Sequence, residues 1–96
     1  MLLKQITFDE KAYYWTKNRE TNIEFLRITE RYLNESIRQG GYIYLNRIYE
    51  NLGVAWNPDD ENPCIRNDGV DRIYFIQFEI FDKPNNSLEI LIHRYD

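Results

Sequence analysis

The chain has 96 residues, of which 43% are hydrophobic and 16% aromatic, and its formal net charge is −4. This length holds one hydrophobic core, so we expect a single folded domain over 1–96. The mild acidic excess disfavours binding to nucleic-acid phosphates. No apolar run approaches the roughly 20 residues needed to cross a bilayer, one cysteine cannot form an internal disulfide, and the start MLLKQITFDE turns acidic too soon for a secretory signal. We therefore expect a cytoplasmic protein with no membrane contact.

The first expected element is a helix over about residues 8–38. Thr7 is its expected N-cap, because Glu10 follows three residues later and the two would form a reciprocal capping box. Within 21–37, spacings of three and four residues give the helix one apolar face, made of Phe25, Leu26, Ile28, Tyr32, Leu33 and Ile37. Gly40 is expected to end the helix in the left-handed conformation.

The length of this helix presents a difficulty. About thirty continuous helical residues would span about 45 Å, whereas a compact domain of this size is only about 30–35 Å across. A second capping box, TNIE at 21–24, allows a break near 18–20 and a new helix starting at Thr21, which we favour because each start has its own capping chemistry. The other solution is a continuous helix that projects and pairs with a second copy. Across these two solutions, we expect either a monomer or a homodimer formed through the N-terminal helix.

A second, short helix is expected over 45–52, followed by a long loop. Its apolar residues recur at i, i+3, i+4 and i+7, namely Leu45, Ile48, Tyr49 and Leu52. Gly53 follows as a stop signal, and the preceding YIY at 42–44 favours a strand. Residues 57–71, NPDDENPCIRNDGVD, combine prolines, asparagines and acidic residues and predict a loop, which makes them a candidate functional surface.

The C-terminal part predicts a β-hairpin of strands 72–82 and 88–95 around the turn KPNN. One apolar face is formed by Tyr74, Ile76, Phe78 and Ile80 in the first strand and by Leu88, Ile90 and Ile92 in the second. Because a slip of one residue flips every side chain, these sets share a face only if opposed residue numbers sum to an even number. A three-residue loop at 84–86 meets this condition, pairing Phe78 with Ile92 and Ile80 with Ile90.

Together these elements predict an α+β fold. A long or broken N-terminal helix and a short helix would pack on a small antiparallel sheet dominated by the C-terminal hairpin. Residues 42–44 or 54–56 are candidates for a third strand. The expected core consists of Phe25, Leu26, Leu33, Ile37, Leu45, Ile48, Leu52, Ile76, Phe78, Ile80, Ile90 and Ile92.

The pattern L-x-x-I-x-x-x-L-G-V at 45–54 is typical of the first helix of a helix-turn-helix domain. The residues behind it, AWNPDDENP, contain two prolines and three consecutive acids but no basic set, so the recognition helix is missing. Nucleic acid is therefore a disfavoured partner. A DNA-binding accessory protein with a degenerate helix-turn-helix stands as the alternative function.

The sequence carries no catalytic, cofactor-binding or metal-binding signature. Cys64 and His93 are the only soft metal ligands, and two do not make a zinc site without carboxylate help. The acidic run at 59–61 lacks the spacing of a calcium-binding loop, and the glycines form no phosphate-binding loop. We therefore expect a protein that is not an enzyme and uses no cofactor and no metal.

The best candidate for a binding surface is the acidic loop with the tryptophan before it. Trp56 follows a helix stop and precedes an acidic, proline-containing segment, a position typical of an interface anchor. The negative charges beside it that we expect to meet a partner are Asp59, Asp60, Glu61 and Asp68.

The segment GYIYLNRIYENLG at 41–53 resembles a motif of small uncharacterised proteins from phages and conjugative elements of Gram-positive bacteria, G-Y-[VI]-x-L-N-x-[VI]-Y-[DE]-x-L-G. The matching residues are Gly41, Tyr42, Leu45, Asn46, Tyr49, Glu50, Leu52 and Gly53. Trp56 matches a later tryptophan, although Ala55 replaces the glycine before it and the intervening segment is shorter. With the final hairpin, the likeness covers about half of the chain.

This resemblance implies a genetic setting and assigns no catalytic residue. It points to an accessory gene of a mobile element, a setting in which such proteins often bind host or rival proteins, anti-defence inhibitors among them. The resulting hypothesis is a non-enzymatic protein-binding accessory protein of a phage or mobile element, acting on an unidentified host or rival protein through its acidic loop.

Overall fold

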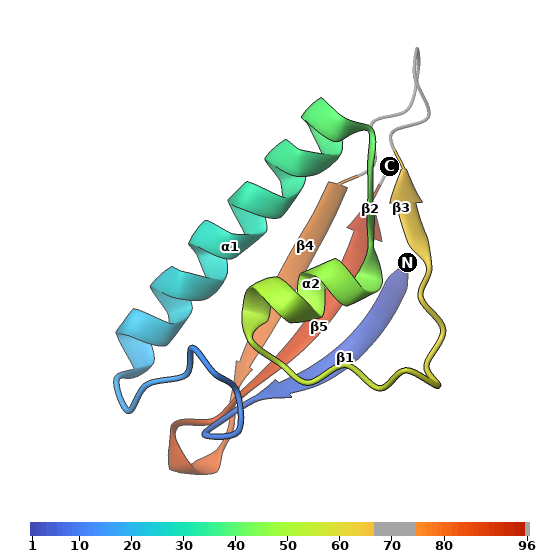
Figure 1. Ribbon diagram of the computed structural model, residues 1–96. Helices are drawn as coiled ribbons and strands as arrows, with labels where there is room; N and C mark the ends of the chain where they lie inside the picture. Colours follow the sequence, from blue (N-terminus) through green and yellow to red (C-terminus); the bar gives the residue numbers. More distant parts are fainter. Residues whose placement is uncertain (67–74, 96) are drawn as a thin grey trace.

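The structure is a computed structural model and describes residues 1–66 and 75–95 (Figure 1). The elements in chain order are β1 (Leu2–Phe8), α1 (Arg19–Gly40), β2 (Tyr42–Tyr44), α2 (Leu45–Leu52), β3 (Cys64–Arg66), β4 (Phe75–Asp82), a 3-10 turn (Pro84–Asn86) and β5 (Leu88–Tyr95). The fold is α+β, as the sequence predicts.

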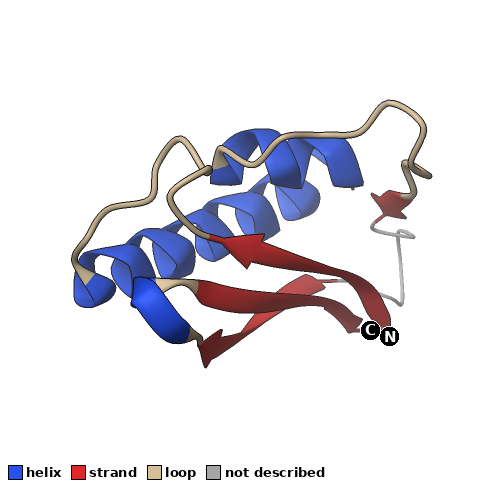
Figure 2. Ribbon diagram, turned by 90° about the horizontal axis from the view of Figure 1, so that it is seen from below, coloured by secondary structure: helices blue, strands red, loops and turns tan. Residues whose placement is uncertain are grey.

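The described strands form two antiparallel sheets. The larger has the strand order β1-β5-β4, and the smaller pairs β2 with β3. Both helices lie over the same face of the larger sheet, so the molecule has two layers (Figure 2). Within 1–66 and 75–95, no helix lies over the opposite face of this sheet.

The C-terminal hairpin has the predicted register. Phe78 pairs with Ile92 and Ile80 with Ile90, which confirms the parity argument. The Lys83 N–H donates to the Ser87 carbonyl at 2.9 Å and closes a loop over 84–86. Within the described residues the first strand begins at Phe75; the expected residues 72–74 lie outside them.

The N-terminal residues form a strand, so the continuous helix over 8–38 is wrong, whereas the helix that the broken form starts near Thr21 is observed as α1. Thr7 lies in β1 and caps no helix, because the first residues pair with β5 instead. The helix begins at Arg19, and its N-cap is Asn18, whose side-chain oxygen accepts the Thr21 N–H at 2.9 Å. Its 22 residues span about 33 Å, which fits the domain. The length argument for a projecting, helix-paired dimer therefore no longer applies.

Three further details of the first half differ from expectation. Ile28 and Tyr32 are about half exposed, whereas Asn22 and Thr29 lie in the buried stripe of α1. The left-handed residue after α1 is Gly41, with φ 84°, and Gly40 is the last helical residue. The third strand of the main sheet is β1; residues 42–44 pair with β3, and 54–56 are not a strand.

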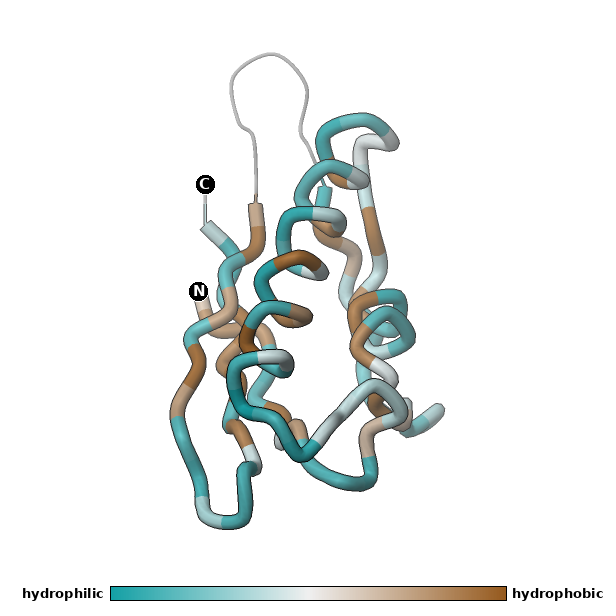
Figure 3. The backbone as a smooth tube through the Cα atoms, turned by 90° about the vertical axis from the view of Figure 1, so that its left-hand side faces the viewer, coloured by the Kyte–Doolittle hydropathy of each residue, from teal (hydrophilic) through white to brown (hydrophobic). Residues whose placement is uncertain are grey.

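The core lies between α1, α2 and the inner face of the large sheet. Apolar and polar residues alternate along the strands and recur turn by turn along α1 (Figure 3). Ten of the twelve expected core residues are buried, and Phe25 and Ile80 are partly buried. Tyr49 and Leu88, which the sequence places on apolar faces but outside the expected core, are also buried. The core residues that the sequence did not predict are Ile6, Phe8, Ala12, Ile43 and Ile65.

Candidate functional site

The loop expected over 57–71 is confirmed only for 57–63, because 64–66 form strand β3, and 67–71 lie outside the described residues. From here on the acidic loop is the segment from Gly53 to Pro63, which connects α2 with β3. Asn57 organises its tip: the side-chain oxygen of Asn57 accepts the Asp59 N–H at 3.0 Å, and its carbonyl accepts the Asp60 N–H at 3.0 Å. Turns of this kind fix the backbone through local hydrogen bonds. The side chains of Asp59 and Glu61 are left exposed to solvent.

The far end of the loop is held by the N-terminus of α2. The Leu45 N–H donates to the Pro63 carbonyl at 3.0 Å, and the Asn46 N–H donates to the Asn62 side-chain oxygen at 2.9 Å. Tyr44, the N-cap residue, supplies no side-chain hydrogen bond. Residues from the loop therefore satisfy helix donors that would otherwise have no partner inside the helix.

Asp60 differs from its two acidic neighbours because it faces the protein. Its carboxylate lies 3.8 Å from the Lys4 ammonium of β1, and both side chains are partly exposed. Burial raises the pKa of the Tyr49 hydroxyl, and the negative charge of Asp60 raises it further. Asp60 thus lies against β1, whereas Asp59 and Glu61 make no ion pair with any described residue.

Trp56 takes part in the packing of the domain, in addition to its predicted position at the edge of the loop. Its ring packs edge-on against Tyr49, with ring centroids 4.9 Å apart, and it is only partly buried against the core. It forms the base of the loop and leaves part of its ring accessible. Asp68, the remaining candidate, lies outside the described residues.

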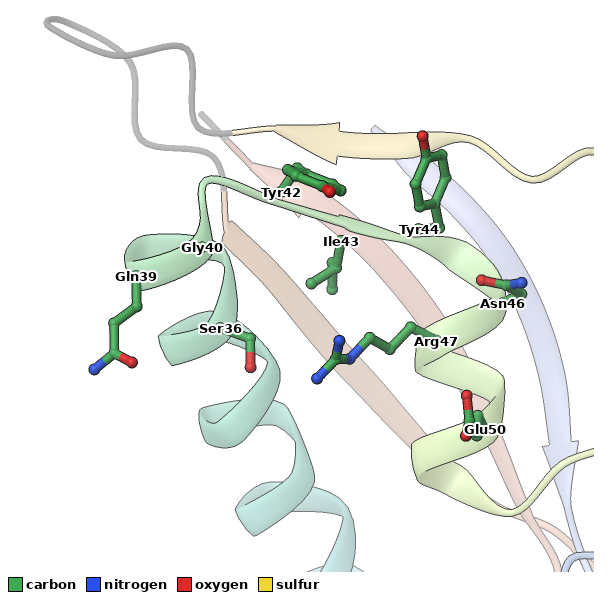
Figure 4. Close-up of a pocket in the computed structure, with 9 residues that line it drawn as sticks. All are labelled: Ser36, Gln39, Gly40, Tyr42, Ile43, Tyr44, Asn46, Arg47 and Glu50. Atoms are coloured by element: carbon green, nitrogen blue, oxygen red, sulfur yellow. The ribbon is translucent and has the colours of Figure 1, made fainter.

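A cleft that the sequence did not predict lies between the C-terminal turns of α1, β2 and α2, and no residue of the acidic loop lines it (Figure 4). Its volume is about 600 Å³, and Arg47 and Glu50 of α2 line it together with Ser36 of α1. Figure 4 shows the Arg47 side chain reaching from α2 toward α1. The signal was present in α2, because burial of Leu45, Ile48, Tyr49 and Leu52 leaves positions 47 and 50 on the open side.

The residues considered for chemistry are not assembled into a reactive group. Cys64 lies on β3 opposite Tyr44, whereas His93 lies on β5 with its Nε2 3.1 Å from a Glu79 carboxylate oxygen. In the part of the chain that the structure describes, no three His, Cys, Asp or Glu residues are placed to hold a metal ion.

The helix-turn-helix pattern has no second half in the structure. After Gly53 the chain is non-helical through Pro63 and then enters β3. The residues that would have formed a recognition helix form the acidic loop.

Comparison of the chain with protein-family models, curated proteins and solved structures gives no match. Among the described residues, neither helix combines the length and apolar character required to span a membrane.

Proposed function

We propose that this protein is a non-enzymatic binding protein that docks on a basic surface of a partner protein through its acidic loop. The observation that supports this most directly is that the loop is acidic and exposed at its tip, yet its backbone is tied down at Asn57, Asp60 and Pro63.

A loop ordered before binding favours association. Binding normally costs free energy because loops and side chains lose conformational freedom, and prior ordering reduces this cost. Asp59 and Glu61 make no ion pair with any described residue, so their charges are available. Negative charge on a fixed loop also steers a basic partner during encounter.

The motif at 41–53 adds the setting. Its resemblance to proteins of phages and conjugative elements supports a role as a mobile-element accessory protein, and inhibition of a host defence protein is the form of that role we propose. Such an inhibitor needs no chemistry of its own, because occupying a basic site is sufficient.

The proposal is tested by affinity capture from the native host with wild type and Asp59→Lys/Glu61→Lys. The matched control is Glu20→Lys/Glu24→Lys, which changes the net charge equally on the exposed side of α1. We expect the loop variant to lose proteins that both wild type and the control retain. Recovery of the same proteins by all three would remove the loop from the proposal.

A further inference from the structure

The two outer edges of the three-stranded sheet differ in the hydrogen bonding of their backbone groups. At the β4 edge, side chains of α1 bond to the strand backbone. Asn34 bonds both to the N–H and to the carbonyl of Ile76, at 2.8 and 2.9 Å. Glu30 accepts the Phe78 N–H at 2.6 Å, and Arg27 donates to the Phe78 carbonyl at 2.8 Å. The outward backbone groups of Ile76 and Phe78 are therefore already paired with α1 and are not available to a further strand.

The register shows which groups face outward on the opposite edge, formed by β1. Because Ile76 and Phe78 direct their backbone groups to α1, the odd residues of β4 bond to β5, and the even residues of β5 must bond to β1. Their partners Lys4, Ile6 and Phe8 therefore face β5. The backbone N–H and carbonyl groups of Gln5 and Thr7 point away from the sheet.

These outward groups have no partner among the described residues, since no hydrogen bond reaches the Gln5 or Thr7 backbone from that side. Figure 1 shows β1 at the outer edge of the larger sheet, beside β5. The side chains of Gln5 and Thr7 do not obstruct this edge, because both bond to the Glu89 carboxylate on β5, at 2.7 and 3.1 Å.

The usual means of protecting a free edge are weak in β1. Native proteins blunt open edges with proline, inward-pointing charge or bulges. Residues 2–8 contain no proline, and the one charged residue, Lys4, lies beside Asp60. In β1 a bulge lies only at the start of the strand, between Leu2 and Lys4. Val54 and Ala55 of the acidic loop share an open pocket with Thr7 but make no hydrogen bond to β1, so the outer backbone groups of Gln5 and Thr7 are unpaired among the described residues.

We propose that β1 pairs antiparallel with β1 of a second copy of this chain, about a two-fold axis at Gln5. Gln5 is the central residue of Leu2–Phe8, and its backbone groups face outward, so two Gln5 residues can exchange hydrogen bonds across the axis. The resulting six-stranded sheet has the order β4-β5-β1-β1-β5-β4.

A second copy of this chain fits the β1 edge better than a strand from a different protein, because the outer strands of the combined sheet would then both be β4. The outward groups of β4 at two positions are already bonded by Asn34, Glu30 and Arg27 of α1. In this register Leu2 lies opposite Phe8 and Lys4 opposite Ile6, so that like charges are never directly opposed. The dimer would pair the β1 edge, the edge of the larger sheet that no helix side chain bonds among the described residues.

The test is light scattering coupled to size-exclusion chromatography over a concentration series. We expect wild type at twice the 11.8 kDa of one chain and Gln5→Pro at the mass of one chain, because proline removes the outward N–H at the axis. Gln5→Ala keeps that N–H and should remain dimeric. A monomeric wild type, or a folded Gln5→Pro that remains a dimer, would overturn the proposal. A monomer that instead captures another protein at β1 would assign the edge to a different occupant and equally overturn it.

A second measurement decides the matter if Gln5→Pro does not fold. In a Cys64→Ser background, Gln5→Cys should be cross-linked to itself by a short bis-maleimide, since the two residues face each other at the axis. Glu24→Cys, on the exposed side of α1, is the matched control and should remain uncross-linked. Equal cross-linking of the two variants would contradict the proposed interface.

Discussion

Asn34 of α1 bonds to Ile76 of β4 as a neighbouring strand would, donating to its carbonyl at 2.9 Å and accepting its N–H at 2.8 Å. A single side-chain amide thus replaces a backbone pair at the end of a sheet. This explains how the sheet ends beside a helix without leaving the part-buried backbone groups of Ile76 unpaired.

Replacing Asn34 by Ala should destabilise the protein by about 1–3 kcal/mol, because both backbone groups of Ile76 lose their partner in a partly buried place. Urea unfolding measures this change. The control is Asn51→Ala, which removes only a bond to a carbonyl of its own helix and should cost under about 0.5 kcal/mol. Equal losses would show that the Asn34 contacts contribute nothing specific.

The start of α1 gives a second prediction. Asn18→Ala should cost about 1 kcal/mol, because its side chain caps the helix. Thr21→Ala should be nearly neutral, although the sequence favours Thr21 as a cap. Thermal or urea unfolding compares the two variants, and a larger loss for Thr21→Ala would contradict the observed helix start.

The two left-handed glycines should differ in their tolerance of a side chain. Gly41→Ala should cost about 1 kcal/mol through backbone strain alone, because no atom lies within 4 Å of the added Cβ. At Gly53 the Cβ would also lie 2.7 Å from Cδ2 of Tyr14 and 3.1 Å from its backbone nitrogen. Gly53→Ala should therefore cost at least about 1 kcal/mol more in urea unfolding. Similar values for the two would argue against the close packing of Tyr14 on this turn.

The pKa of Tyr49 tests the position of the acidic loop. Burial raises this pKa above the ordinary value and Asp60 adds to the shift, so Asp60→Asn should lower it part of the way back. The Cζ chemical shift of the ring, followed by NMR against pH, reports the value. Asp59→Asn is the control and should leave it unchanged; if Asp60→Asn does the same, the loop is not held beside Tyr49.

The same shift has a consequence for stability against pH. Because the pKa of Tyr49 is higher in the folded than in the unfolded state, its contribution is fully present below the unfolded pKa of about 10. That contribution is lost as the pH rises through the folded-state pKa. Unfolding measured across this alkaline range should therefore show a smaller loss for Tyr49→Phe than for wild type.

The elements that the sequence predicts well are those with local determinants. The hairpin register follows from alternation and parity at Phe78 and Ile92, and α2 follows from four apolar residues before Gly53. The first strand could not be recognised in this way. Thr7 and Glu10 resemble a helix cap locally, but Thr7 pairs with Glu89, more than eighty positions away, and this tertiary contact prevails over local capping chemistry.

In the candidate site, too, features set by local sequence could be predicted and those set by long-range contacts could not. Exposure of Asp59 and Glu61 could be predicted from the proline-rich, acidic composition of the loop. The attachment of Asp60 to Lys4 and the bond from Asn46 to Asn62 could not, because each joins residues that are distant in sequence. The cleft at Arg47 likewise depends on how α1 and α2 come together.

The capping of α2 by Pro63 and Asn62 makes this helix dependent on a segment that follows it in the chain. A two-turn helix is not stable by itself in water, so α2 should form only when the loop has closed over its first turn. A ligand that holds the loop in place should therefore slow amide hydrogen exchange in α2, even though it touches no residue of the helix. Amide hydrogen exchange in α2 would then detect binding of a ligand at the acidic loop.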